Sequence, residues 1–362
     1  MKINFFITSL GGGGAERVVC NLSNYMISRQ HEITITVLRG NDETYKLKNE
    51  VCVWYLQPSY YSDNKSKFYR VKEISTVLKY LKGIPQDVML VSFLELPVAY
   101  SLFFKPFIKS KLIICERNNP LFYPKGYQWI FKLFTRRADG VVCQTKVIRD
   151  WYSPHISKKT SIVVIPNSIN QDILNANVIK GRQKVILTMG RLEPQKNQRL
   201  LISAFAELAN QYPEWNLHIY GKGPLENVLR KEIESYGLVG RVELLGFTKD
   251  VVSAYRTAGL FVLTSNHEGM PNVLAEAMAM GLPCVSTDCG GGGARELIQD
   301  CINGLLIPCN DKEALVKSIN YILKDVNYRN NLGAMASKIR NELNPDTIHR
   351  QWEVFFIQLY NR

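Results

Sequence analysis

The sequence predicts an α/β protein built from two doubly wound domains, each a parallel sheet with helices on both faces. Two observations lead to this fold class: apolar segments of strand length alternate with amphipathic segments along the chain, and the alternation pauses once and restarts near residue 184. Strands that are near-continuous apolar runs are typical of parallel sheets covered on both faces. The length of 362 residues fits two such domains.

Seven apolar runs predict the strands of the first half, and helical spacing fills the gaps between them. The expected strands are Lys2–Thr8, Glu32–Leu38, Val51–Leu56, Asp87–Phe93, Lys111–Cys115, Gly140–Cys143 and Ser161–Ile165. The clearest expected helices are Ala15–Ser28, Val71–Leu81 and Tyr127–Arg137. The apolar stretch from Val88 to Phe104 is interrupted by Glu95 and Pro97, so a buried strand followed by a helix explains it better than a membrane span.

The same alternation resumes in the second half. The expected strands there are Lys184–Met189, Trp215–Tyr220, Arg241–Leu245, Leu260–Leu263, Pro283–Ser286 and Leu305–Ile307. Helices are expected at Asn197–Gln211, at Leu225–Tyr236 and through a helix-rich tail from Asp311. We expect a first domain over 1–175, joined by the terminal helix 345–362, and a second domain over 176–344, with ligands between them at the carboxyl ends of strands.

Charge is spread unevenly over these two halves. The chain carries 45 basic and 32 acidic side chains; residues 1–178 account for a net +11 and residues 179–362 for only +2. The first half is therefore expected to face an anionic partner. Eight cysteines without a CxxC pair, and a start that lacks a signal-peptide core, predict reduced thiols and a cytoplasmic protein.

Glycine runs follow a strand in each half. Gly11–Gly14 comes after the first strand and precedes a helix, and Gly290–Gly293 comes after Pro283–Ser286. Such turns let the backbone approach a ligand closely, and a helix start offers unpaired N–H groups to an anion, although a flexible turn is the alternative. The spacing is not a dinucleotide fingerprint, because position 16 is Glu16, where that motif needs glycine.

Two stretches of the second half carry candidate chemistry. Arg191 and Lys196 follow the restart strand, where two cations suit a diphosphate as well as they suit solvated surface positions. Glu268 and Glu276 flank the start of an expected helix at Pro271. Ligand hydroxyls or ordinary helix capping and solvation account equally for these carboxylates, and the amides of Gly269 and Met270 could reach an anion.

In order along the chain, these motifs resemble the family-4 retaining glycosyltransferases of the GT-B fold. The resemblance rests on Gly11–Glu16, Ile165–Ile169, Gly190-Arg191-Leu192 with Lys196-Asn197, and Glu268 with Glu276 eight residues later. Ser92–Leu94 and Glu116–Pro120 further resemble bacterial members that build O-antigen, capsule or lipid-linked oligosaccharide chains.

The resemblance implies a UDP-sugar donor held by the second domain, and it assigns roles to residues. Arg191 and Lys196 would hold the diphosphate and stabilise the leaving charge, with Glu268, Gly269 and Met270 orienting the sugar. Glu276 would bind the ribose hydroxyls, and Gly13 and Gly14 would close over the diphosphate or acceptor side. The remaining donor contacts implied are Gly190, Phe247, Pro271 and Asn272. The family needs no metal or other cofactor, and the departing phosphate oxygen is thought to take the acceptor proton.

One departure from the family concerns the first domain. Many relatives place a histidine where this chain has Glu116-Arg117, so Arg117 is expected to contact the sugar or an acceptor phosphate instead. Residues 105–137 carry a net charge of +7 with interleaved aromatics. An aromatic and cationic helix face suits an anionic membrane surface, although a solvated helix packed on its own sheet is the alternative. The candidates for acceptor and membrane contact are Arg117, Trp129, Lys132, Arg136 and Arg137.

The sequence therefore predicts a retaining, metal-independent hexosyltransferase. We expect it to move a hexose or N-acetylhexosamine from a UDP-sugar to a polyprenyl-diphosphate-linked saccharide, on the inner face of the plasma membrane, in bacterial surface polysaccharide synthesis. A nucleotide-sugar 2-epimerase of similar architecture is the first alternative. A non-catalytic nucleic-acid or membrane binder follows from charge alone, but it leaves the glycine runs and the Glu268/Glu276 pair unexplained, so no nucleic-acid partner is expected.

Overall fold

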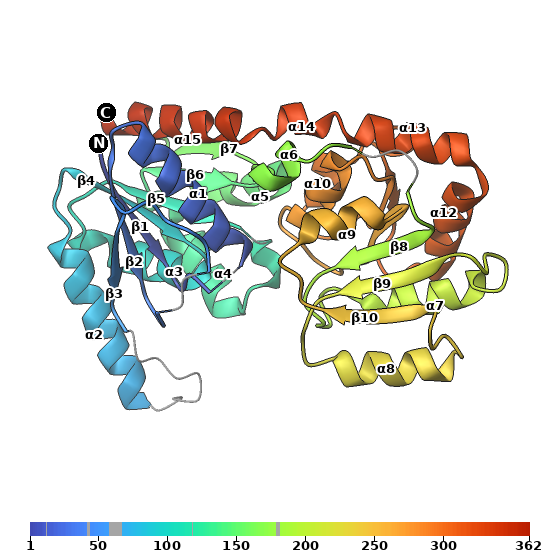
Figure 1. Ribbon diagram of the computed structural model, residues 1–362. Coiled ribbons are helices and arrows are strands. Elements are labelled where there is room, and N and C mark those ends of the chain that lie inside the picture. The colour runs from blue at the N-terminus through green and yellow to red at the C-terminus, as the bar shows by residue number, and fades with distance from the viewer. Residues whose placement is uncertain (12, 42–43, 58–66, 118, 179–181) are drawn as a thin grey trace. The chain divides into compact units, whose positions relative to one another are not determined.

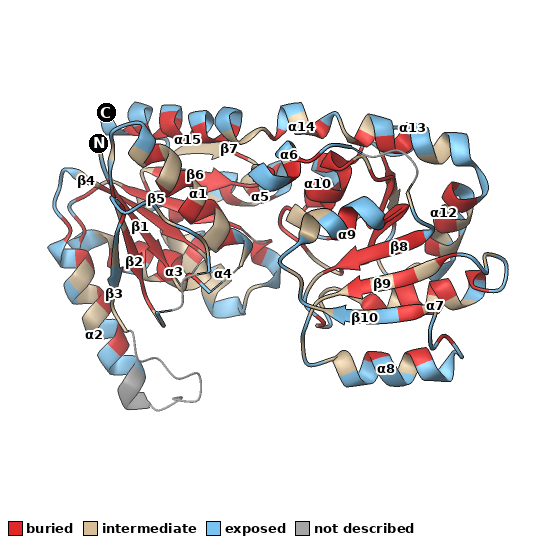
Figure 2. Ribbon diagram, in the orientation of Figure 1, coloured by how far each residue is buried: buried red, intermediate tan, exposed pale blue. Residues whose placement is uncertain are grey.

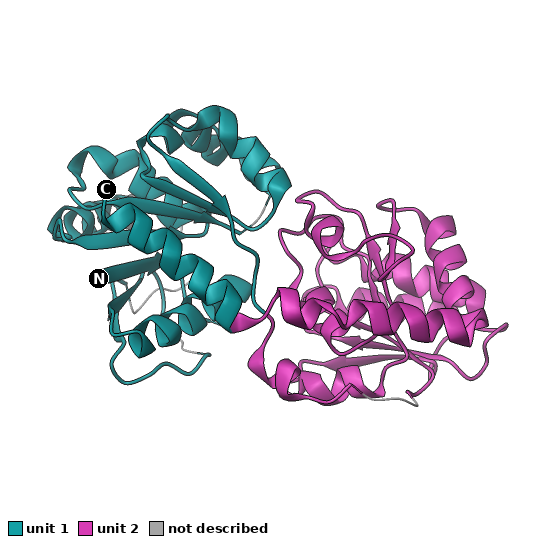
Figure 3. Cartoon of the chain, turned by 90° about the horizontal axis from the view of Figure 1, so that it is seen from above, with its two compact units in different colours: residues 1–168, 346–362 teal, residues 169–345 magenta. Residues whose placement is uncertain are grey.

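The computed structural model describes residues 1–11, 13–41, 44–57, 67–117, 119–178 and 182–362 (Figure 1). Gly12 of the first glycine run and Asn118 of the Glu116–Pro120 motif lie outside the described residues. The chain divides into two compact units (Figure 3). Unit 1 comprises Met1–Ser168 and Asp346–Arg362, and unit 2 comprises Ile169–Pro345.

Unit 1 contains a parallel sheet in the order β3-β2-β1-β4-β5-β6-β7. Its strands are β1 (Lys2–Ile7), β2 (Glu32–Val37), β3 (Cys52–Tyr55), β4 (Val88–Phe93), β5 (Leu112–Glu116), β6 (Gly140–Cys143) and β7 (Ser161–Val164). Its helices are α1 (Gly14–Ser28), α2 (Lys67–Gly83), α3 (Glu95–Phe104), α4 (Lys125–Phe134), α5 (Lys146–Tyr152) and α15 (Pro345–Tyr360). Short 3₁₀ turns are η1 (Lys105–Phe107), η2 (Pro120–Phe122), η3 (Thr135–Arg137) and η4 (Ser153–His155).

Unit 2 repeats this architecture with the order β10-β9-β8-β11-β12-β13. Its strands are β8 (Val185–Met189), β9 (Asn216–Tyr220), β10 (Val242–Gly246), β11 (Leu260–Leu263), β12 (Cys284–Thr287) and β13 (Leu305–Ile307). Its helices are α6 (Gln171–Asn175), α7 (Gln198–Leu208), α8 (Glu226–Ser235), α9 (Val251–Thr257), α10 (Asn272–Ala279), α11 (Gly293–Leu297), α12 (Lys312–Lys324), α13 (Val326–Ala336) and α14 (Ile339–Glu342).

Both sheets confirm the expected doubly wound α/β fold. All strand pairs run parallel, for example Lys2–Ile7 in register with Glu32–Val37, and the central strands are buried along their length (Figure 2). Helices bury one face on the sheet and expose the other, as the alternating colours of α7 and α8 show in Figure 2. The apolar stretch Val88–Phe104 forms β4 followed by α3, as predicted.

The C-terminal helix α15 belongs to unit 1. Trp352 stacks on Phe93 at 5.9 Å between ring centroids, and Phe356 lies 6.4 Å from Phe5. On the same helix, the Glu353 carboxylate accepts hydrogen bonds from Tyr25 (3.1 Å) and the Arg29 Nε (3.2 Å) of α1. Burying each such aromatic side chain is worth about 1.5–3 kcal/mol, so α15 is part of the core of unit 1.

Candidate active site

In unit 2, the candidate residues gather where the direction of strand addition reverses. The chain adds β9 and β10 on one side of β8 and then β11, β12 and β13 on the other, so β8 and β11 are neighbours at the switch point. Ligands of open parallel sheets bind outside the carboxyl ends of strands at this point. Gly190 directly follows β8, and the loop that carries Glu268 directly follows β11.

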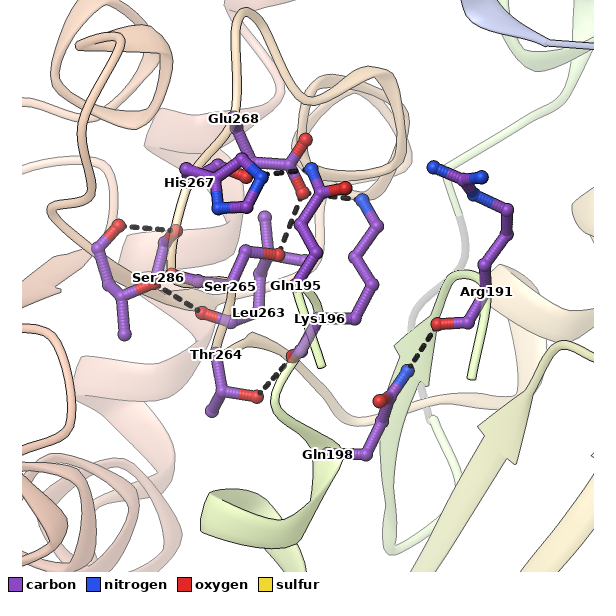
Figure 4. A network of polar contacts seen from close by, with 11 residues as sticks. Arg191, Gln195, Lys196, Gln198, Leu263, Thr264, Ser265, His267, Glu268 and Ser286 are labelled. Carbon is purple, nitrogen blue, oxygen red and sulfur yellow. Dashed lines mark hydrogen bonds and ion pairs between the residues drawn. The ribbon is translucent and has the colours of Figure 1, made fainter. Parts of the chain in front are cut away.

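The centre of this site is an ion pair between Lys196 and Glu268. The Lys196 Nζ donates a short hydrogen bond to the Glu268 Oε1, and the Ser265 hydroxyl donates to the same oxygen at 2.7 Å (Figure 4). The two charged side chains are only 15% and 10% exposed. A charge this far from water is tolerated when it is paired and hydrogen-bonded, so each side chain holds the other in place.

A second set of hydrogen bonds fixes the two loops that carry this pair. The Gln195 Nε2 donates to the backbone carbonyl of His267 at 2.8 Å, and the Thr264 hydroxyl donates to the carbonyl of Lys196 at 3.1 Å (Figure 4). Sequence reasoning did not single out Thr264, Ser265 or Gln195. The sequence does contain a signal for the first two, because their hydroxyl side chains come directly after the apolar strand Leu260–Leu263, at the edge of the sheet where ligands bind.

The second glycine run shapes the Glu268 loop from the other side. A Cβ atom at Gly293 would lie 1.9 Å from the backbone oxygen of Gly269, which is closer than any real contact. The Glu268 amide donates to the carbonyl of Gly290 at 3.2 Å. Within the structure, this run therefore lets the backbone of the Glu268 loop pack closely against the start of α11.

The segment Gly221-Lys222-Gly223, which follows β9, also serves packing. A Cβ at Gly221 would lie 1.9 Å from the carbonyl oxygen of Gly190, so glycine is needed for this close approach. The Gly190 amide in turn donates to the carbonyl of Tyr220 at 3.0 Å. The turn after β9 thus supports the segment that leads to Arg191.

Arg191 lies beside the buried pair but in contact with solvent. Its side chain is 68% exposed and forms a 3.2 Å ion pair with Glu193. Figure 4 shows its guanidinium extending in the same direction as the ammonium of Lys196. The carbonyl of Arg191 accepts a 2.9 Å hydrogen bond from Gln198, which fixes the backbone at this position. Because this ion pair is exposed and weak, the guanidinium fork of Arg191 can exchange Glu193 for an anionic ligand.

Helix α10 places Glu276 in the interior of unit 2. Glu276 is buried, and its Oε2 accepts a hydrogen bond from the Tyr255 hydroxyl at 3.3 Å. Pro271 caps the helix instead of occupying its first turn, and Asn272 is the first helical residue. The helix is apolar and buried from Leu274 onward, so a carboxylate here needs polar partners.

The other predicted donor contacts of unit 2 differ in exposure. Gly269, Met270 and Pro271 are buried in the loop before α10, whereas Phe247 is exposed just after β10. Burial lowers the pKa of His267 at this site, with the ammonium of Lys196 acting in the same direction and the Glu268 carboxylate opposing it. Burial also raises the pKa of the Cys289 thiol to about 12, so this cysteine is uncharged near neutral pH.

In unit 1, Gly13 and Gly14 stand at the corresponding switch point between β1 and β4. Gly13 precedes α1 and Gly14 is its first residue, and the carbonyl of Gly13 accepts a 3.3 Å hydrogen bond from Tyr45. At the end of the neighbouring strand, Leu94 has a φ of +69°, a left-handed conformation that leucine rarely adopts. Backbone strain of this kind clusters at ligand sites.

Arg117 is buried in unit 1, with 5% of its surface exposed. Its Cζ lies 5.3 Å from the ring centroid of Phe93 and 5.5 Å from that of Trp352. Among the described residues, none accepts a hydrogen bond from its three side-chain nitrogens. Burial lowers the pKa of Arg117 to about 10, so the guanidinium still carries its charge at neutral pH. An unpaired buried cation of this kind is a candidate contact for an anionic or hydroxyl-rich ligand.

The remaining first-half candidates form an exposed face on α4 and η3. Trp129 is 59% exposed, and Lys132 and Arg136 are exposed as well. Arg137 is half-buried, with its guanidinium 4.2 Å from the ring of Phe134. Phe131 is fully buried and belongs to the core. Arg117 does not belong to this face either, because it is buried beside the rings of Phe93 and Trp352.

Two further features are absent from the described part of the chain. No group of three or more His, Cys, Asp or Glu side chains there is arranged to hold a metal ion. No helix there is both long enough and apolar enough to cross a bilayer.

Comparison with known proteins agrees with this architecture. The model for glycosyl transferases group 1 matches residues 170–339, and the model for glycosyltransferase family 4 matches residues 12–173. The chain is 28% identical, over 100% of its length and 99% of the relative, to the GalNAc-α-(1→4)-GalNAc-α-(1→3)-diNAcBac-PP-undecaprenol α-1,4-N-acetyl-D-galactosaminyltransferase of Campylobacter jejuni. It is also 28% identical to the amylovoran biosynthesis glycosyltransferase AmsD of Erwinia amylovora, over 94% of this chain and 95% of the relative.

Solved structures show the same fold. The crystal structure of Anabaena HepE in complex with UDP superposes with a TM-score of 0.80 at 20% identity, over 99% of this chain and 100% of that one. The two family models together span most of the sequence, in the order in which unit 1 and unit 2 occur. The chain belongs to the family-4 glycosyltransferases and has their GT-B fold.

Proposed function

We propose that this glycosyltransferase moves a hexose or N-acetylhexosamine from a UDP-sugar to a polyprenyl-diphosphate-linked saccharide, with retention of anomeric configuration, in bacterial surface polysaccharide synthesis. The observation that carries the proposal is the buried Lys196–Glu268 pair beside Arg191 at the switch point of unit 2. The Campylobacter relative, whose name specifies a PP-undecaprenol-linked saccharide, supports the acceptor class, and the name of the Erwinia relative, amylovoran biosynthesis glycosyltransferase, supports a role in polysaccharide synthesis.

In this proposal, the cations of unit 2 stabilise the leaving diphosphate. As the bond between the anomeric carbon and the diphosphate oxygen breaks, negative charge grows on that oxygen, and Lys196 and Arg191 donate hydrogen bonds to it. The acceptor hydroxyl oxygen bonds to the anomeric carbon on the same face, and its proton passes to the departing phosphate oxygen. Removing one preorganised donor at such a charge typically costs about 10²–10³ in turnover.

Glu268 and Glu276 have separate roles in the proposed donor site. Glu268 holds Lys196 and, with the loop amides of Gly269 and Met270, orients the transferred sugar. Glu276 accepts hydrogen bonds from the ribose hydroxyls, with Gly190, Phe247, Pro271 and Asn272 completing the site. The protein's own cations supply the charge, so we propose that transfer needs no metal or other cofactor.

Unit 1 is proposed to bind the acceptor and the membrane. Gly13 and Gly14 face the diphosphate or acceptor, and Arg117 supplies a buried cation to an acceptor phosphate or sugar. The exposed Trp129, Lys132 and Arg136 would rest on anionic headgroups at the inner face of the plasma membrane, where cations and tryptophan are favoured. We expect the protein to co-sediment with anionic vesicles at low salt and to lose this association at high salt. If it does not co-sediment at low salt, the proposed membrane contact is wrong.

A donor screen tests the proposed activity. Purified protein is mixed with individual UDP-sugars and a synthetic lipid-diphosphate sugar acceptor, and UDP release and the anomeric configuration of the product are recorded. We expect release that depends on the acceptor, with a retained configuration and with no loss of activity in EDTA. UDP release together with a rearranged free sugar, in the absence of acceptor, would instead identify a nucleotide-sugar 2-epimerase.

A further inference from the structure

Unit 1 contains a cavity of about 400 Å³ among α2, α3 and α4. Its lining includes Ile74 of α2, Leu96, Ala99 and Phe103 of α3, and Tyr127 and Ile130 of α4. Among the residues that the structure describes, no charged side chain contributes to the lining. A cavity of this size is large enough for part of a small ligand, and its walls favour an apolar one.

The polar atom of another lining residue, Tyr100, is already engaged. Its hydroxyl donates a 2.8 Å hydrogen bond to Glu73. Glu73 is itself held by two 2.7 Å hydrogen bonds from Arg39. The surface of the cavity as a whole is almost entirely apolar, so a sugar or nucleotide there would leave most of its hydroxyl or amide groups unsatisfied, which is costly. A hydrocarbon chain makes no such demand.

The position of the cavity links it to substrate binding. Leu96 lies in the first turn of α3, directly after β4, and Tyr127 lies in the first turn of α4, which follows β5 after a loop. Both helix starts are at the carboxyl-end edge of the sheet, where substrates of doubly wound domains bind. A hydrocarbon chain bound in this cavity would therefore lie next to the substrate-binding edge of the sheet, where it can be part of a substrate.

The mouth of the cavity combines exposed aromatic rings with cations. Phe103 lines the cavity, is half exposed and meets Phe134 edge-on at 5.9 Å. The guanidinium of Arg137 lies over the ring of Phe134, which also contacts Trp129 edge-on. Exposed Lys132 and Arg136 are on the same helical segment. Phe103, Phe134 and Arg137 lie at the C-terminal ends of α3 and α4, opposite the helix starts at the substrate-binding edge. This mouth therefore suits a hydrocarbon chain that continues toward an anionic membrane surface.

We propose that this cavity takes the segment of the isoprenoid chain next to the diphosphate of the lipid-linked acceptor, with the diphosphate at the carboxyl-end edge of the sheet and the rest of the chain leaving past Phe103. The inference rests on the proposed function and names the part of the acceptor that unit 1 recognises. A single branched chain suits one cavity among three helices better than a phospholipid, which brings two acyl chains.

Two tryptophan substitutions on α2 test the proposal. Ile74 lines the cavity and is 42% exposed, whereas Val71, one turn earlier, is 65% exposed and outside the lining. Because both positions have access to water, both variants are expected to fold. Binding of geranylgeranyl diphosphate and of inorganic diphosphate is measured by equilibrium dialysis with the full chain. Ile74→Trp should weaken geranylgeranyl diphosphate binding at least tenfold, Val71→Trp should change it less than twofold, and inorganic diphosphate should bind alike to all three proteins.

Equal binding of geranylgeranyl diphosphate to Ile74→Trp and wild type would overturn the proposal. The proposal would also be overturned if soluble dihexanoyl phosphatidylglycerol displaced bound geranylgeranyl diphosphate as effectively as unlabelled geranylgeranyl diphosphate does. The cavity would then be a phospholipid site. Measuring sugar transfer to a water-soluble saccharide without a lipid distinguishes a wrong assignment of the cavity from a wrong proposed function. Ile74→Trp should keep that transfer at the wild-type rate and lose affinity only for the prenyl-linked acceptor, whereas no transfer by wild type to either acceptor would refute the function itself.

Discussion

The ammonium of Lys196 and the carboxylate of Glu268 contact each other across 72 residues of sequence, at the carboxyl ends of two adjacent strands. Both side chains are largely shielded from water. The pair also connects the two loops of the proposed donor site, so the position of one charge depends on the other.

Glu268→Gln tests this dependence. Glutamine keeps an acceptor for Ser265 and Lys196 but removes the negative charge that fixes the ammonium. We expect turnover to fall at least tenfold while affinity for UDP, measured by calorimetry, is retained or increased, because Lys196 is no longer neutralised. Weaker UDP binding with unchanged turnover would contradict the positioning role of Glu268.

Arg191→Gln tests whether Arg191 contributes to sugar transfer without contributing to stability. An exposed ion pair is worth about 0–1 kcal/mol, so losing the contact with Glu193 should leave the melting temperature almost unchanged while the rate of sugar transfer falls. Arg199 offers a matched control, since it is 60% exposed and paired with Glu232 on the outside of unit 2. Arg199→Gln should keep full activity, and an equal loss in both variants would argue against a specific role for Arg191.

Gly293→Ala tests the packing of the Glu268 loop. The new Cβ would meet the backbone oxygen of Gly269, which has no room to retreat without moving the loop. We expect a loss of about 1–3 kcal/mol in stability, together with reduced turnover. Gly83→Ala at the end of α2 is the control, because its Cβ would meet no atom within 4 Å. If the melting temperature of Gly293→Ala matches that of Gly83→Ala, the close approach is not a constraint.

His349 on α15 predicts a pH dependence of stability. Burial lowers its pKa to about 4, below the value of about 6.5 for an unfolded chain. Between these values the unfolded state binds more protons, so stability is full above about pH 6.5 and is lost as the pH falls toward 4, by up to about 3 kcal/mol. His349→Phe keeps a ring beside Tyr25 and should flatten this part of the melting-temperature profile. Identical profiles of variant and wild type would exclude His349 as the cause.

The strands were the most predictable part of the fold, because burial on both faces of a parallel sheet requires continuous apolar runs. Gly140–Cys143, Leu260–Leu263 and Leu305–Ile307 have the expected bounds, and the other strands differ by one residue at one or both ends. The helix expected at Tyr127–Arg137 instead starts at Lys125 and gives way to the 3₁₀ turn η3 after Phe134. Helices of five to seven residues, such as α6 and α9, contain too few turns to show a period.

The contacts of the site were less predictable than its location. Sequence placed Glu268 before α10 and Glu276 within it, and the structure confirms both positions. Nothing in the sequence indicates that Lys196 pairs with Glu268, since that contact depends on the strand order that makes β8 and β11 neighbours. The burial of Arg117 depends in the same way on Trp352, which lies far along the chain on α15.

The most direct test of the central claim is the turnover of Lys196→Ala in the donor assay, with folding checked by circular dichroism. The account predicts a folded variant whose sugar transfer is about a hundredfold to a thousandfold slower, because the leaving diphosphate has lost its buried cation. Transfer at the wild-type rate by the folded variant would contradict the account.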